Sequence, residues 1–172
     1  VLVEPIQGES GIRMAPEGYL EGLRALCDQH GWLLMLDEVQ TGGGMTGTPW
    51  AWQHYGVAPD IMAFGKKLQV CGLTAGGRVD EVRGNVFETP SRINSTWGGN
   101  LTDMVRARRI LEIVERDDLM GNARREGGYL LGRLEDFARR HPVVSNPRGI
   151  GLMCAITLPD KAMRDEVIRR LV

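Results

Sequence analysis

The chain has 172 residues, of which 42% are hydrophobic and 25% are charged, a composition typical of a globular domain with its own core. Lysine and arginine (21) nearly balance aspartate and glutamate (22), so the net charge of -1 gives no electrostatic reason to expect binding to nucleic acid or an anionic membrane. No hydrophobic run reaches the length of a transmembrane helix, and the three widely spaced cysteines indicate free thiols in a cytoplasmic protein.

The first part of the chain alternates between strand and helix patterns. Residues 1–3 are predicted as a short buried strand, and residues 4–11 as a loop leaving its end. A helical pattern begins at Pro16 and ends at His30, where a glycine follows. Residues 32–36 are five consecutive apolar residues, which is typical of a strand buried on both faces. The order strand, helix, strand predicts a parallel crossover.

A glycine-rich loop and two more strand patterns follow. Residues 41–48 form the loop, which lacks the Gly-Lys-Ser/Thr ending of a nucleotide-binding P-loop, so we interpret it as a flexible active-site turn. Residues 51–55 are predicted as a short helix, residues 61–64 as a third buried strand, and residues 73–79 as a strand interrupted by glycine. These elements predict an α/β fold with a mostly parallel sheet and helices on both faces.

Two long helices dominate the second half. Asn100 is expected to cap a helix over residues 101–116, and a second helix is predicted over residues 119–140. A turn at 146–149 and a strand at 151–158 then precede a final helix.

The composition changes after His141-Pro142, where we predict a domain boundary. Residues 1–142 are interpreted as part of a large ligand-binding domain, and residues 143–172 as the start of a smaller C-terminal domain. Both chain ends fall inside predicted elements, so we interpret the chain as a segment of a longer protein.

Polar side chains follow two of the buried strands. Asp37 follows the strand at 32–36, and Lys66 follows the strand at 61–64. Ligands of open α/β sheets bind just beyond the carboxyl ends of the strands, so both side chains are expected to face one crevice. A structural ion pair is one interpretation. The other is a cofactor site, because a lysine can form an imine with an aldehyde and a carboxylate can hold a protonated ring nitrogen.

The residues around this pair resemble a known signature. Asp37-Glu38-Val39-Gln40 followed by Thr-Gly, and Pro59-Asp60-Ile61 followed at the family's spacing by Lys66, are similar to the motifs of class III pyridoxal-phosphate aminotransferases. The resemblance covers essentially the whole chain. It implies the large domain of the fold type I pyridoxal enzymes, pyridoxal 5'-phosphate as cofactor, and a homodimer.

The resemblance also implies roles for individual residues. Asp37 would pair with the pyridine nitrogen, Val39 would pack on the ring face, and Gln40 would donate a hydrogen bond to the phenolic oxygen. Lys66 would carry the cofactor as an imine and move the proton between substrate and cofactor. Lys67 is the rival lysine, although the family's spacing falls on Lys66. Thr96 would reach the phosphate of the partner subunit's cofactor.

Further stretches are similar to the lysine 6-aminotransferase branch of the family, notably residues 64–72 and 91–104. This similarity implies transfer of the terminal amino group of L-lysine to 2-oxoglutarate, giving 2-aminoadipate 6-semialdehyde and glutamate. Glu9 would bind substrate as part of a switch with an arginine outside this chain, and Asn94 would line the substrate channel.

Alternatives remain open at the level of sequence. The amine donor of a class III enzyme could instead be ornithine or 4-aminobutyrate, and a truncated segment could be inactive alone. No metal site is predicted, because His54 and His141 lack nearby residues at the spacing of metal ligands.

Overall fold

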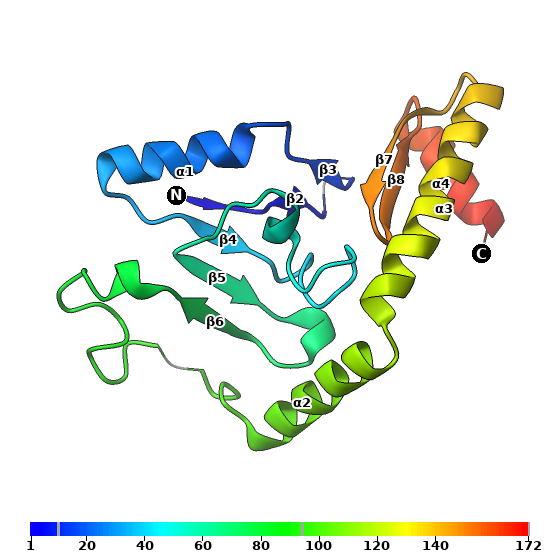
Figure 1. Cartoon of the computed structure of the whole chain (residues 1–172). Helices are drawn as coiled ribbons and strands as arrows, with labels where there is room; N and C mark the ends of the chain where they lie inside the picture. Colours follow the sequence, from blue (N-terminus) through cyan, green and yellow to red (C-terminus); the bar gives the residue numbers. More distant parts are fainter. Residues whose placement is uncertain (10, 94, 172) are drawn as a thin grey trace.

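Four strands form the central sheet, in the order β1-β4-β5-β6. In this computed structural model, β1 (Leu2–Val3), β4 (Met35–Asp37) and β5 (Ile61–Phe64) are parallel neighbours, and β6 (Gly72–Ala75) joins the β5 edge as an antiparallel strand (Figure 1). The predicted α/β class and mostly parallel sheet are thereby confirmed. The structure describes residues 1–9, 11–93 and 95–171.

Helix α1 (Tyr19–His30) covers one face of this sheet (Figure 1). Its side chains Leu20 and Cys27 are fully buried against Leu34, which precedes β4, and Leu36, which lies within β4. Burial of this apolar surface is the main contribution to the stability of α1. The helix ends at Gly31, whose φ of 64° is the left-handed conformation that glycine adopts at least cost.

Two small hairpins, three further α-helices and three short 3-10 helices make up the rest of the secondary structure in the described residues. Helices α2 (Leu101–Arg116) and α3 (Leu119–Arg140) begin and end where the sequence predicts, and Asn100 caps α2 by accepting a hydrogen bond from the N–H of Thr102 at 2.9 Å. The α3 helix packs against the hairpin of β7 and β8 (Figure 1). The remaining elements are β2 (Ile6–Gln7), β3 (Arg13–Met14), η1 (Ala51–His54), η2 (Lys66–Leu68), η3 (Gly77–Val79), β7 (Ser145–Ile150), β8 (Met153–Thr157) and α4 (Lys161–Leu171).

The predicted strand over residues 32–36 is wrong at its start. The N–H of Trp32 donates to the carbonyl of Cys27 at 2.8 Å, so this residue still belongs to the hydrogen-bonded end of α1. Its side chain is 51% exposed and stacks on His30, with 4.6 Å between the ring centroids. The β4 ladder therefore begins only at Met35.

The predicted turn at residues 146–149 and part of the predicted strand at 73–79 are also corrected. Residues 146–149 lie within β7, where a register shift between Ser145 and Arg148 leaves Pro147 outside the regular ladder. Proline is tolerated in a strand at such a bulge because it has no N–H to donate. Arg78 and Val79 belong to η3 rather than to a strand.

The glycine-rich loop at 41–48 is packed rather than open. Thr41 and Thr46 are each 1% exposed, and the N–H of Leu152 donates to the carbonyl of Met45 at 2.9 Å. A Cβ at Gly47 would stand 2.4 Å from Cγ of Arg124 on α3. The loop therefore joins the sheet to α3 and the β7–β8 hairpin, which corrects its interpretation as a flexible turn.

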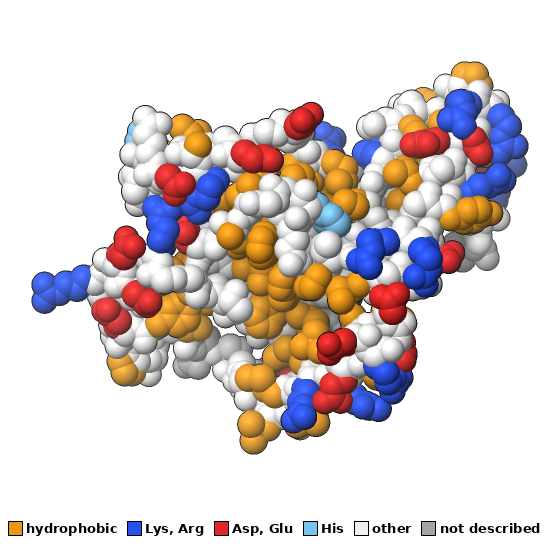
Figure 2. All heavy atoms as spheres, viewed as in Figure 1, with side chains coloured by type: hydrophobic (Ala, Val, Ile, Leu, Met, Phe, Trp, Pro, Cys, Tyr) orange, Lys and Arg blue, Asp and Glu red, His pale blue; other side chains and the backbone are white. Residues whose placement is uncertain are grey.

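Charged side chains gather on the outer helices, and hydrophobic side chains spread over the centre of the face in Figure 2. None of the helices in the described part of the chain is long and apolar enough to cross a membrane.

Candidate active site

The carboxyl ends of β4 and β5 lie beside each other and bring the predicted pair onto one edge of the sheet. Asp37, the last residue of β4, is in register with Ala63 of β5, and the N–H of Glu38 donates to the Ala63 carbonyl at 2.9 Å. Lys66 is separated from β5 by one residue and lies at the start of η2. Within the described residues, Asp37 and Lys66 form no ion pair, so the structural alternative to a cofactor site is not seen here.

The carboxylate of Asp37 is half-buried and only partly used by the protein. Its Oδ1 accepts a hydrogen bond from the N–H of Val39 at 3.0 Å, which fixes the carboxylate relative to the chain that follows. Oδ2 accepts no hydrogen bond from the described residues. A carboxylate held at a strand end with one oxygen available is suited to a cationic N–H donor from a ligand.

Gln40 lies over the backbone of Gly8, in the loop that follows β2. A Cβ added at Gly8 would stand 2.1 Å from Oε1 of Gln40 and 2.3 Å from its Cδ. Glycine at position 8 therefore makes room for the Gln40 amide. Sequence reasoning missed this role, because the two residues are distant in the chain and only the fold brings them together.

Lys66 has an exposed side chain and a constrained backbone. Its φ of 45° is in the left-handed region, which a residue with a Cβ adopts only at a cost in free energy. The N–H of Gln69 donates to the Lys66 carbonyl at 2.8 Å and closes the turn that holds this conformation. In the described part of the chain the ammonium group makes no hydrogen bond or ion pair, so it is available to react.

Lys67, the rival lysine, is engaged by the protein. Its Nζ donates a hydrogen bond to the backbone carbonyl of Gln40. Burial lowers the pKa of Lys67 and the charge of Lys66 lowers it further, while the carboxylate of Glu38 acts in the opposite direction. Of the two lysines, Lys66 is therefore the one whose amino group the protein leaves without a partner.

Glu38 is a buried carboxylate that sequence reasoning treated only as part of a motif. It is 1% exposed and accepts hydrogen bonds from the N–H groups of Ala51 at 3.0 Å and Trp52 at 2.8 Å, and from the hydroxyl of Thr41. A buried charge without such partners would be strongly destabilising. Glu38 thus fastens the tip of β4 to η1, from the side opposite to Asp37.

Asp60 is a structural residue at the other end of β5. It is 7% exposed, accepts a hydrogen bond from the N–H of Leu34 at 2.7 Å, and pairs with Arg24 at 2.9 Å and Arg78 at 3.6 Å. Burial acts to raise the pKa of this carboxyl, but the Leu34 and Arg24 hydrogen bonds and the arginine charges outweigh it, so the pKa lies below its ordinary value. Asp60 therefore stabilises the sheet rather than joining the candidate site.

The remaining predicted site residues lie apart from this centre. Glu9 is exposed in the turn between β2 and β3, and Thr96 is exposed in the segment that leads from η3 to α2 (Figure 1). Neither side chain has a hydrogen bond or ion pair to Asp37, Gln40 or Lys66 in the described part of the chain. Asn94 lies outside the described residues.

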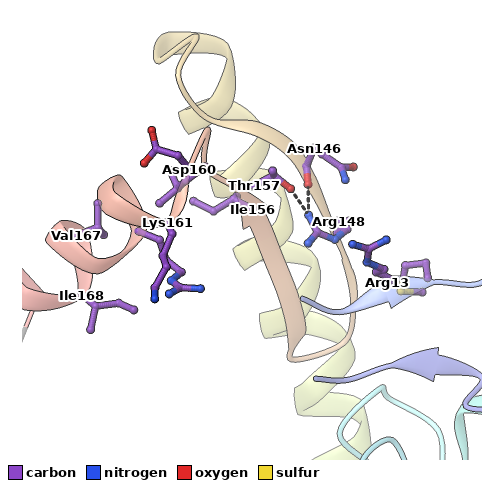
Figure 3. Close-up of a pocket in the computed structure, with 12 residues that line it drawn as sticks. Arg13, Asn146, Arg148, Ile156, Thr157, Asp160, Lys161, Val167 and Ile168 are labelled. Carbon is purple, nitrogen blue, oxygen red and sulfur yellow. Dashed lines mark hydrogen bonds between the residues drawn. The ribbon is translucent and has the colours of Figure 1, made fainter. Parts of the chain in front are cut away.

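A cavity of about 1010 Å³ opens elsewhere, between β3, the β7–β8 hairpin and α4 (Figure 3). Arg148 at its edge is already engaged, because it donates to the carbonyls of Ile12 at 3.0 Å and Asn146 at 2.8 Å and to the hydroxyl of Thr157 at 3.0 Å. None of the predicted cofactor residues lines this cavity. Its size alone does not make it a reactive site, and the candidate site stays at the ends of β4 and β5.

Comparisons with known proteins agree with one another. The family model described as Aminotransferase class-III matches residues 1–172. An L-lysine-epsilon aminotransferase from Mycobacterium tuberculosis is 60% identical over 99% of this chain and 38% of its own length. One from Amycolatopsis lactamdurans is 56% identical over the same shares. The solved lysine aminotransferase from M. tuberculosis in the internal aldimine form has a TM-score of 0.92 at 59% identity, covering 99% of this chain and 39% of that one. This chain thus spans about 38% of the length of the curated relatives it matches.

Proposed function

The chain belongs to the class III aminotransferase family, and on that basis we propose that the protein containing it transfers the terminal amino group of L-lysine to 2-oxoglutarate. The products would be 2-aminoadipate 6-semialdehyde and glutamate. The observation that carries this proposal is the high identity, over nearly the whole chain, to relatives from two genera that are both named L-lysine-epsilon aminotransferase.

The residues at the ends of β4 and β5 fit the cofactor of this family, pyridoxal 5'-phosphate. The free Oδ2 of Asp37 suits a protonated pyridine nitrogen, and the unpartnered amino group of Lys66, once it has lost a proton, suits the aldehyde carbon, with water leaving as the imine forms. The space that Gly8 leaves for the Gln40 amide suits a hydrogen bond to the phenolic oxygen. When bound, the cofactor supplies an electron sink for the carbon that loses its proton.

We assign each of these side chains a task. Asp37 would keep the ring nitrogen protonated, Val39 would pack on the ring face, and Gln40 would orient the phenolic oxygen. Lys66 would hold the cofactor and then move a proton at the substrate carbon through its Nζ. Glu9 and Asn94 are proposed to contact substrate.

A homodimer is part of the proposal, because Thr96 would then serve the phosphate in the neighbouring subunit. Apolar side chains around Thr96 support it: Trp97 is 76% exposed, Leu101 80% and Val105 71%. Exposed large apolar side chains grouped in this way are typical of surfaces that another protein covers.

We also propose that the chain is a segment of a longer protein, with residues 1–142 in the large domain and residues 143–172 beginning the small one. The separate sheet of β7 and β8 supports this division, and the share of the relatives that the chain covers supports a longer protein. The free state of Cys27, Cys71 and Cys154 suits a cytoplasmic location.

The test is a comparison of amine donors with the complete protein that contains this chain. L-lysine, L-ornithine and 4-aminobutyrate are each supplied with 2-oxoglutarate, and glutamate formation is measured. We expect kcat/KM for lysine to exceed the other two by roughly tenfold or more. A preference for ornithine or 4-aminobutyrate would leave the family assignment in place and would contradict L-lysine as the amine donor. The 172-residue chain alone, assayed in parallel, shows whether the segment is active without the rest.

A further inference from the structure

At the ends of β4 and β5, a side chain with an unpartnered polar group is followed each time by a side chain that is hydrogen-bonded to the protein. Asp37 and Lys66 carry groups that the protein leaves partly or wholly unpartnered, whereas the next residues, Glu38 and Lys67, are tied to the protein by hydrogen bonds. Each proposed cofactor residue is thus followed by an anchor. Glu38 anchors the β4 tip to η1, and Lys67 anchors the segment after β5 to the segment after β4.

The Lys67 anchor connects two parts of the candidate site directly. Its Nζ donates to the backbone carbonyl of Gln40, 27 residues earlier in the chain. One end of the link is therefore the neighbour of Lys66, and the other is a residue whose amide is proposed to contact the cofactor. Ladder hydrogen bonds do not make this connection, because the register of β4 with β5 ends at Asp37 and Ala63.

The surroundings of Lys67 strengthen the link. The side chain is half-buried, while that of Lys66 is exposed, so the Lys67 hydrogen bond is shielded from competing water. Burial and the charge of Lys66 lower the pKa of Lys67, and the carboxylate of Glu38 acts against that shift by favouring the charged form. A hydrogen bond from a charged donor is stronger than one between neutral groups.

We propose that Lys67 is a positioning residue: by donating a hydrogen bond to the Gln40 carbonyl it fixes the distance and orientation between Gln40 and Lys66, two residues that would hold the cofactor. This inference rests on the proposed function and deepens it. Lys67 does not touch the reacting atoms, and it acts through the backbone of Gln40. Its loss lets the two strand ends move relative to one another, so that the cofactor meets a less well-organised site.

The test uses three variants of the complete protein. Lys67→Met removes the charged donor and keeps a side chain of similar length, Lys67→Arg keeps a charged donor, and Lys161→Met removes an exposed lysine of α4 as the matched control. The affinity for pyridoxal phosphate is measured by titrating the visible absorption of the bound cofactor. Thermal unfolding of the cofactor-free proteins is measured separately, and borohydride fixation with peptide mapping identifies the labelled lysine.

We expect Lys67→Met to bind the cofactor about tenfold more weakly, because part of the binding free energy is then used to order the two strand ends that the Lys67 hydrogen bond holds in the parent. Its cofactor-free form should stay folded and unfold at a somewhat lower temperature than the parent, because one intraprotein hydrogen bond is lost. Its label should remain on Lys66, and Lys67→Arg should recover most of the affinity. Parent-like affinity in Lys67→Met would overturn the proposal, as would an equal loss in Lys67→Arg or Lys161→Met. If the parent itself shows no absorption band, the proposed function fails; if only the variants behave unexpectedly, the failure belongs to the positioning role.

Discussion

Gly8 and Gln40 occupy adjoining space although they are far apart in the sequence, and a Cβ at Gly8 would stand 2.1 Å from Oε1 of Gln40. The Gln40 amide is the end of a flexible side chain, so it can move away from a methyl group at little cost in stability. We therefore predict that Gly8→Ala leaves the free energy of unfolding nearly unchanged and weakens binding of pyridoxal phosphate by about fivefold, the value of one neutral hydrogen bond.

Gly22→Ala is the matched control for this change. Gly22 lies on the exposed side of α1, and nothing stands within 4 Å of the position that its Cβ would take. Alanine there should stabilise the protein by about 0.5–1 kcal/mol through helix propensity and should leave cofactor binding as it is. Cofactor binding that is equally strong in the Gly8→Ala and parent proteins would mean that the Gln40 amide does not depend on the space above Gly8.

Glu38→Ala should destabilise the protein and weaken the site together. The change leaves the N–H groups of Ala51 and Trp52 without their acceptor inside the protein. We expect a loss of about 2–4 kcal/mol in the free energy of unfolding, measured with urea on the cofactor-free protein. A loss no larger than that caused by an exposed glutamate, such as Glu17→Ala, would show that the buried carboxylate does not fasten η1.

Asp60→Asn should make stability less dependent on pH in the acid range. The pKa of Asp60 is lower in the folded protein than in the unfolded chain, so its stabilising contribution is present above the unfolded pKa and is lost as pH falls through the folded pKa. We expect Asp60→Asn to cost about 2–4 kcal/mol at pH 7, and the difference from the parent to shrink below about pH 4.

The exposed residue Asp117, paired with Arg116 on the surface, provides the comparison for Asp60. Asp117→Asn should leave urea unfolding at pH 7 unchanged, because solvent and salt screen an exposed pair. A difference between Asp60→Asn and parent that stays constant from pH 7 to pH 3 would exclude the ionised carboxylate as its cause.

Asp37→Asn should affect chemistry far more than folding. Asparagine keeps the shape of the side chain and can still accept the N–H of Val39, but it cannot hold a proton on a ring nitrogen by charge. We expect kcat to fall by about 100-fold or more, with the unfolding free energy within about 1 kcal/mol of the parent. A variant with nearly normal kcat would show that the carboxylate at the end of β4 has no electrostatic role in the reaction.

Local patterns predicted the elements on which the site is built. Apolar runs ending at Asp37 and near Lys66 predict two parallel strands, and the Asn100 cap and the helical spacing of apolar residues predict α2 and α3. The predictions that were wrong depend on contacts outside the local sequence. The apolar run predicts a strand at Trp32, because an apolar run does not reveal the hydrogen bond from Trp32 to Cys27. Pro147 predicts a turn, because the sequence does not reveal the bulge by which β7 accommodates a proline.

The candidate site shows the same limit. Asp37 and Lys66 stand out in the sequence because each is a charged residue at or just after the end of an apolar run. The roles of three other residues depend on contacts that only the folded chain makes. Gly8 adjoins the Gln40 side chain, Glu38 accepts from the N–H of Trp52, and Lys67 donates to the Gln40 carbonyl. Sequence reasoning therefore predicts the groups that would react, but it does not reveal the contacts by which neighbouring residues hold them in place.

Borohydride fixation is the simplest way to determine whether Lys66 binds the cofactor. The complete protein is saturated with pyridoxal phosphate, reduced, digested and mapped by mass spectrometry. We expect one label per chain, located on Lys66 and absent from the Lys66→Ala variant. A label on Lys67, or one distributed between Lys67 and Lys161, would contradict this expectation.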